Sequence, residues 1–83
     1  MYRIIIERKA AKEIENIPND VIQRITDAIK SLGHNPRPHN SKKLIGEIGW
    51  RIRISNYRIL YMIEDSQKLV TIYRVKHRRE AYR

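Results

Sequence analysis

The chain has 83 residues, with 18 Lys and Arg against nine Asp and Glu, a formal net charge of +9, and no cysteine. The length suits a single domain spanning residues 1–83, and the lack of cysteine excludes disulfides, thiolate metal sites and a thiol nucleophile. The histidines lack metal-site spacing, the N-terminal stretch lacks the apolar core of a signal peptide, and no apolar run approaches the ~20 residues that span a bilayer. We therefore expect a cytoplasmic protein with no metal, cofactor or membrane contact. Its charge suits a polyanionic partner, or alternatively serves only solubility.

The first half of the chain predicts one strand and two helices. Residues 2–7 alternate in side-chain character with a period of two, as in a strand. Residues 10–17 carry apolar side chains at helical spacing, and Pro18 ends this first helix. A second apolar stripe runs over residues 21–32, and Gly33 should end that helix in the left-handed conformation. We expect the two helices to lie on a sheet as an antiparallel pair.

The second half predicts a loop followed by a sheet. Residues 34–43 contain two prolines and several basic side chains without apolar periodicity, which is typical of a basic surface loop. Apolar alternation then predicts strands over residues 48–54, 57–64 and 69–75. The order β-α-α-β-β-β gives an α+β fold with two helices packed on an antiparallel sheet. Residues 77–83 form either a fraying tail or a single helical turn.

The hairpin between the first two of these later strands concentrates positive charge. If Ser55 and Asn56 form a two-residue turn, Arg53 faces Arg58 and Arg51 faces Leu60. Two guanidinium groups at ~6 Å repel by roughly 1–3 kcal/mol, and guanidinium groups fork onto phosphate oxygens. This pattern favours a phosphate-binding face, with a solvated sheet face of splayed arginines as the alternative.

The other face of the hairpin is apolar and is expected to be core, with its aromatic residues packed rather than stacked on bases. Its members are Trp50, Ile52, Ile54, Tyr57, Ile59, Tyr61 and Ile63. Tyr82 differs because it lies in a basic tail where no apolar periodicity requires it. Stacking of Tyr82 on a nucleobase is one hypothesis, and docking of the tail onto the domain is the other.

Four segments of the chain together resemble the RelE branch of the RelE/ParE toxin superfamily over nearly the whole length. They are Lys43-Leu44 with Gly46, Gly49-Trp50-Arg51-Ile52-Arg53-Ile54, Asn56-Tyr57-Arg58-Ile59-Leu60-Tyr61 and Val75-Lys76-His77-Arg78-Arg79-Glu80-Ala81-Tyr82. The resemblance implies a RelE-like microbial RNase fold and the toxin of a type II toxin–antitoxin module. It further implies an endoribonuclease that enters the ribosomal A site, cuts messenger RNA there to arrest translation and growth, and is held inactive in a hetero-oligomer by a RelB-like antitoxin helix.

The same resemblance implies metal-free transesterification, in which the 2′-hydroxyl attacks the adjacent phosphate. It assigns phosphate stabilisation to Arg58, charge stabilisation or leaving-group protonation to Arg78, and base orientation to Tyr82. At two strand positions where well-studied members carry lysines, this chain has Arg51 and Arg53, and arginine does not serve as a base.

The proton acceptor must then be found elsewhere. His77 is the candidate because it neighbours Arg78 and imidazole titrates near neutrality, with Tyr82 and Glu80 as weaker choices. His77 as a plain surface residue, and slow catalysis by orientation and arginine electrostatics alone, stay open as alternatives.

Further basic residues are expected to contact RNA or the ribosome, namely Arg37, Lys42, Lys43, Arg51, Arg79 and Arg83. The competing interpretations are a non-catalytic ParE-like inhibitor of DNA gyrase, a ribosome-binding protein without cleavage and a general nucleic-acid binder. The fold serves more than one activity, so fold alone does not choose among them. The collected arginines favour RNA, because a pure protein binder has no chemical need for them.

Overall fold

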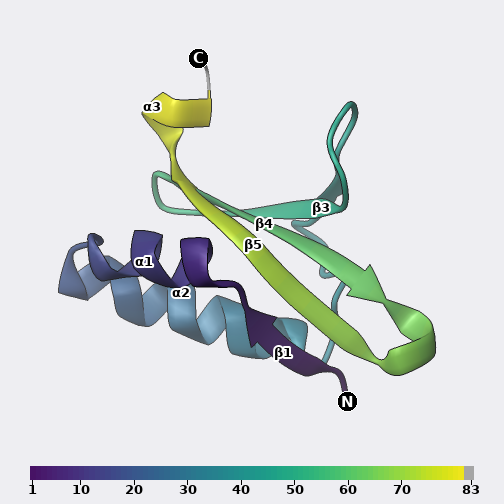
Figure 1. Cartoon of the computed structure of the whole chain (residues 1–83). Coiled ribbons are helices and arrows are strands. Elements are labelled where there is room, and N and C mark those ends of the chain that lie inside the picture. The colour runs from purple at the N-terminus through teal and green to yellow at the C-terminus, as the bar shows by residue number, and fades with distance from the viewer. Residues whose placement is uncertain (82–83) are drawn as a thin grey trace.

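The computed structural model describes the backbone of residues 1–81 and the side chains of residues 1–79 (Figure 1). A short 3-10 turn over Asp65–Gln67 joins the two longest strands. The other elements, in chain order, are β1 (Arg3–Ile6), α1 (Arg8–Glu15), α2 (Asn19–Leu32), β2 (Lys42–Lys43), β3 (Trp50–Ile54), β4 (Tyr57–Glu64), β5 (Leu69–His77) and α3 (Arg78–Ala81).

The strands form one sheet in the order β1-β5-β4-β3-β2. All neighbours are antiparallel except β1 and β5, which run parallel, as a connection through two helices allows. The α+β fold and the predicted element order are confirmed, with two additions. Lys42 and Lys43, expected in a loop, pair with Arg51 and Trp50 as the short strand β2. The tail opens with the helical turn α3.

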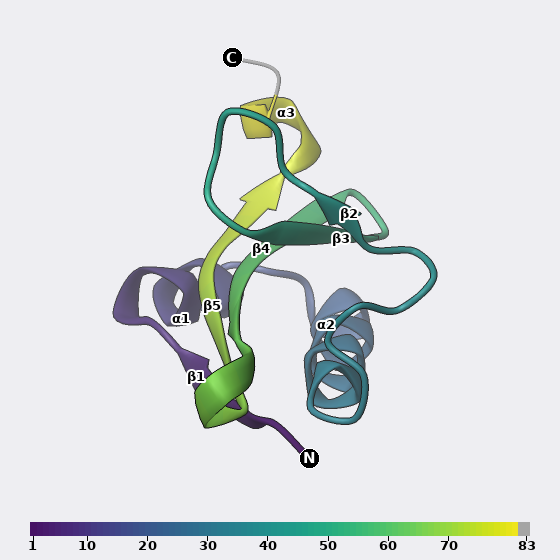
Figure 2. The same ribbon diagram turned by 90° about the vertical axis from the view of Figure 1, so that its right-hand side faces the viewer.

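One face of the sheet is covered by α1 and α2 and holds the core (Figures 1 and 2). Helix α1 lies along β5, whereas α2 packs towards β1 and β3, so the helices divide this face between them rather than forming a close pair. The predicted apolar face of the hairpin is confirmed, because all seven of its residues lie in or against the core. The core of fully buried apolar residues comprises Ala10, Ile17, Ile25, Ile29, Leu32, Ile52, Ile59, Tyr61, Val70, Ile72 and Val75.

Gly33 is required for a different reason from the one predicted. Its backbone is right-handed, with φ −66° and ψ −28°, so the expected left-handed stop is wrong. The chain instead passes close by, since the Tyr2 N–H donates to the Gly33 carbonyl at 2.7 Å. A Cβ at Gly33 would lie 3.1 Å from the Tyr2 carbonyl oxygen. Glycine therefore lets the end of α2 contact the start of β1 directly.

No helix within residues 1–81 is long and apolar enough to cross a membrane. In the same part of the chain, no three His, Asp or Glu side chains gather as a group that could hold a metal ion.

Candidate functional site

The tip of the β3–β4 hairpin is built as the sequence predicts. Ser55 and Asn56 form the turn, and Ser55 takes a φ of 56°, which two-residue hairpin turns favour at this position. The expected register is confirmed, with Arg53 opposite Arg58. The start of α3 is tied to this turn, because the Arg78 N–H donates to the Asn56 carbonyl at 2.6 Å.

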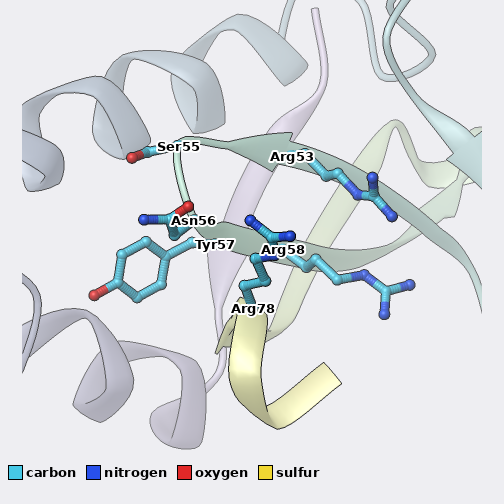
Figure 3. A pocket seen from close by; sticks show the side chains of 6 residues that line it. All are labelled: Arg53, Ser55, Asn56, Tyr57, Arg58 and Arg78. Carbon is cyan, nitrogen blue, oxygen red and sulfur yellow. The ribbon is translucent and has the colours of Figure 1, made fainter. Parts of the chain in front are cut away.

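A pocket of about 270 Å³ opens at this tip (Figure 3). Arg53 and Arg58 extend in the same direction from neighbouring strands, and Arg78 approaches from α3. The structure thus brings together three of the five side chains predicted to be catalytic. The lining residues are Arg53, Ser55, Asn56, Tyr57, Arg58 and Arg78.

Among the side chains of residues 1–79, three arginines and no carboxylate line this pocket. The ion pairs found among the described side chains are Arg37–Asp65 and Arg74–Glu13, and neither includes a pocket arginine. The Nε of Arg58 is buried without a hydrogen-bond partner in that same part of the molecule. An unpaired buried donor costs about 1–3 kcal/mol, and more when it is charged. A bound anion would offset that cost, and phosphate oxygens match the guanidinium geometry.

One cation next to Arg58, Lys76, was not predicted as a site residue. It pairs with Arg58 across β4 and β5, so Arg53, Arg58 and Lys76 form one row across three strands. Because paired residues share a face of the sheet, this row lies on the face turned away from the two helices, which we call the outer face. The sequence did contain a sign of this position. Lys76 directly follows Val75, whose side chain is in the core, so the side chain of Lys76 points to the other face.

His77 lies on the opposite face from this row. It pairs with Tyr57, and the two rings meet edge to face with centroids 5.1 Å apart. Its Nδ1 accepts the N–H of Arg79 at 3.2 Å, and its side chain lines a groove beside the end of α1. Successive strand residues point to opposite faces, so the sequence neighbour of Arg78 is turned away from the arginine pair. The geometry gives His77 no path to a phosphate held by Arg58.

The other predicted site residues lie in varied settings. Arg37 is held by Asp65 through two hydrogen bonds of 2.8 and 3.2 Å and lies over the Trp50 ring, so it is already occupied. Arg37, and then the Tyr2 hydroxyl, hold the pKa of the Asp65 carboxyl at about 2.

The remaining basic residues flank the outer face or the tail. Lys42 and Lys43 are exposed on β2, Arg51 is half-buried on β3, and Arg79 is exposed on α3. Lys42 and Arg51 are paired, which places both on the outer face. Tyr82, Arg83 and the side chain of Glu80, a weaker base candidate, lie outside the described part of the chain.

Comparison with known proteins places this geometry in a family. Residues 4–82 match the family model of the ParE toxin of type II toxin–antitoxin systems. The RelBE2 toxin–antitoxin complex of Mycobacterium tuberculosis contains a chain with 26% identity and a TM-score of 0.82, over 93% of this chain and 98% of that one.

Two further solved structures are similar. The archaeal RelE–RelB complex of Pyrococcus horikoshii gives 25% identity and a TM-score of 0.83, over 93% of this chain and 94% of that one. The E. coli RelBE complex gives 23% identity and a TM-score of 0.79 over 93% and 96%, a likeness of fold. The chain therefore belongs to the RelE/ParE family and is the toxin of a type II toxin–antitoxin system.

Proposed function

We propose that this toxin is an endoribonuclease that cleaves messenger RNA in the ribosomal A site, in the cytoplasm, by attack of a 2′-hydroxyl on the adjacent phosphate. One observation carries the proposal, namely a pocket lined by Arg53, Arg58 and Arg78. Within the described part of the chain no carboxylate joins them, and the buried Nε of Arg58 has no hydrogen-bond partner. A pocket that only bound protein would not need to gather uncompensated guanidinium groups around one point.

The arrangement suits stabilisation of charge on a reacting phosphate. Attack of the 2′-oxygen on phosphorus builds a dianionic phosphorane, and preorganised cations aimed at that charge lower the barrier. Arg58, in the middle of the outer-face row, would hold the phosphate oxygens together with Arg53. Arg78, which reaches the pocket from α3, would stabilise the charge that develops on the leaving 5′-oxygen. Tyr82 would orient a base, and Lys42, Lys43 and Arg51 would hold the flanking RNA or the ribosome.

We also propose that a cognate antitoxin covers the apolar groove on the other side of the molecule. The groove, of about 460 Å³, is lined by β1, α1 and α2, and β1 is an edge strand of the sheet. Ile6 lines it and is 41% exposed, and Lys30 borders it. An acidic amphipathic segment complements both the apolar lining and the net charge of +9. Two similar structures are complexes with RelB antitoxins. We expect Ile6→Asp, at the exposed edge of this groove, to prevent co-purification of toxin and antitoxin while leaving toxicity intact, and retained co-purification would contradict this placement.

The cleavage proposal is tested by mapping messenger 5′ ends after induction of the wild type and of Arg78→Ala. We expect new 5′ ends within translated codons for the wild type and none for the variant. Supercoiling of plasmid DNA by gyrase should be measured in the same cultures. Intact messengers together with loss of supercoiling would replace this proposal with gyrase inhibition, the activity that the same fold could equally carry.

A further inference from the structure

The proposed reaction needs a group that accepts the proton of the attacking 2′-hydroxyl. Arginine keeps its proton in proteins, so Arg51, Arg53 and Arg58 do not fill this role. His77 faces the helices, against Tyr57 and next to Val75. The side chains of Tyr82 and Glu80 lie outside the described part of the chain. Among the described side chains, the acceptor is therefore sought elsewhere on the outer face.

A β-bulge decides which residue of β5 stands beside Arg58. From the pair Glu64–Leu69 to the pair Tyr61–Ile72, each residue of β4 faces one residue of β5 in regular order. Between Leu60 and Tyr61 the register shifts by one residue of β5. Without that shift Val75 would face Arg58, whereas with it Lys76 does. Bulges re-aim side chains next to functional sites, and this one places a cation next to Arg58 and a valine in the core.

The resulting row places Lys76 directly beside Arg58, at the edge of the pocket that Arg58 lines. Arg53, Arg58 and Lys76 occupy neighbouring strands, which lie ~4.8 Å apart, on one face. Lys76 also precedes Arg78 by two residues, so one strand end positions both. Like charges directly across a ladder destabilise it, and no described carboxylate pairs with Arg53, Arg58 or Lys76. Of the three cations, only the lysine can become a neutral amine, the form in which lysine acts as a general base.

We propose that Lys76 is the proton acceptor for the attacking 2′-hydroxyl, a role that rests on the cleavage function proposed above. The neutral amine takes the 2′ proton as the bond between O2′ and phosphorus forms. The bond between phosphorus and O5′ breaks, and its electron pair stays on O5′, which takes a proton from water. The products are a 2′,3′-cyclic phosphate and a 5′-hydroxyl, and the ammonium of Lys76 returns its proton to solvent. Lys76 thereby supplies what the strand positions of Arg51 and Arg53 lack.

The test separates the charge of Lys76 from its proton transfer. Lys76→Arg keeps the charge but removes the base, and Lys76→Ala removes both. Single-turnover cleavage of a ribosome-bound messenger should fall by roughly 10²–10⁴-fold in both variants, the usual contribution of a general base. Affinity for the same RNA carrying a 2′-O-methyl group at the cleaved position, which blocks the nucleophile, should be unchanged for Lys76→Arg. Lys12→Arg, an exposed lysine on α1, is the matched control.

Two further readouts address folding and mechanism. Ethylamine added to Lys76→Ala should restore cleavage in proportion to its free-base concentration, which a merely structural role would not produce. The wild-type rate should level off at high pH, whereas the Lys76→Arg rate should keep rising with hydroxide.

Three outcomes decide between the proposals. If Lys76→Arg cleaves at the same rate as the wild type, the role of Lys76 is overturned and the cleavage function stands. A slow Lys76→Ala that ethylamine does not accelerate would also overturn it. Absence of cleavage by the wild type on ribosomes would overturn the proposed function and this role together.

Discussion

Two arginine sites at different corners of the sheet differ in what neutralises them. Near the β4–β5 turn, Arg37 binds Asp65 through two hydrogen bonds, the Tyr2 hydroxyl donates to the same carboxylate, and the guanidinium lies over Trp50. At the hairpin tip, Arg53, Arg58 and Arg78 share a pocket that no carboxylate of residues 1–79 lines. At the first corner the positive charge is paired with a carboxylate of the same chain. At the second corner the arginines are available to a ligand.

The contrast shows how a strongly basic protein divides its charge between stability and function. A net charge of +9 alone does not say which arginines bind a partner. The presence or absence of a carboxylate partner within the chain shows which arginines are available to a ligand. A paired guanidinium must give up that partner before it holds a phosphate. Arg74 belongs with the first class because it binds Glu13, at 24% and 19% side-chain exposure.

The largest effect is expected at the unneutralised corner. Arg58→Ala should lower single-turnover cleavage by roughly 10²–10³-fold, as does removal of one donor that stabilises a charged transition state. Its melting temperature should stay equal to that of the wild type or rise, because a like-charge pair is removed. Arg37→Ala is the control. It should show the reverse, with a lower melting temperature and a cleavage rate close to that of the wild type.

Removal of an internal carboxylate should weaken the fold instead of the activity. Glu13 accepts the Val75 N–H at 2.7 Å and the Arg74 Nε at 3.0 Å, at the part of β5 that extends past β1. Glu13→Ala removes both hydrogen bonds and should cost about 1–3 kcal/mol in the free energy of unfolding. Urea denaturation measures it, with Glu15→Ala on the same helix as the control. Equal stability of the two variants would contradict this account.

A carboxylate placed at the hairpin tip should neutralise the arginines there, as Asp65 neutralises Arg37 at the first corner. Arg53→Glu puts an acid directly opposite Arg58, and opposite charges across a ladder contribute roughly 0.2–1 kcal/mol. We expect a small rise in the free energy of unfolding together with loss of RNA binding. Arg24→Glu on α2 makes the same change in net charge away from the site. If it weakens RNA binding as much, overall charge rather than local neutralisation governs affinity.

The smallest effect is expected in how the stability contributed by the Arg37–Asp65 pair depends on pH. The pKa of Asp65 is about 2, below its ordinary value of 3.8, so the unfolded chain takes up this proton first as pH falls. The stability that the ionised carboxylate contributes is complete above pH 3.8 and is lost as pH falls through about 2. The difference in melting temperature between wild type and Asp65→Asn should therefore be constant near neutrality and shrink over that window. Glu15→Gln should show no such window.

Much of the fold followed from local patterns because β3, β4 and β5 each turn one face to the core. Alternation over the hairpin predicted which side chains enter the core, and a two-residue turn fixed Arg53 opposite Arg58. The short strand β2 was missed because two lysines carry no alternation. The role of Gly33 was misassigned, since the approach of Tyr2 is a contact between segments far apart in the chain.

The candidate site was less predictable than the fold. Sequence adjacency favoured His77 because it neighbours Arg78, but alternation along β5 turns it towards Tyr57. The spacing of Ile72 and Val75, both buried and three residues apart, was a readable sign that strict alternation breaks between them. Only the pairing of β4 with β5 shows that the break brings Lys76 beside Arg58.

The sequence by itself determined the composition of the outer face of the hairpin and its excess of arginine, because both depend on period-two patterning within a few residues. The tertiary structure decided which of those arginines meet a carboxylate and which lysine joins them. Those pairings join Arg37 to Asp65, Arg74 to Glu13 and Lys76 to Arg58, and all three join separate segments of the fold. A long-range pairing is set by how helices and strands pack and by one bulge in register, neither of which a local pattern encodes.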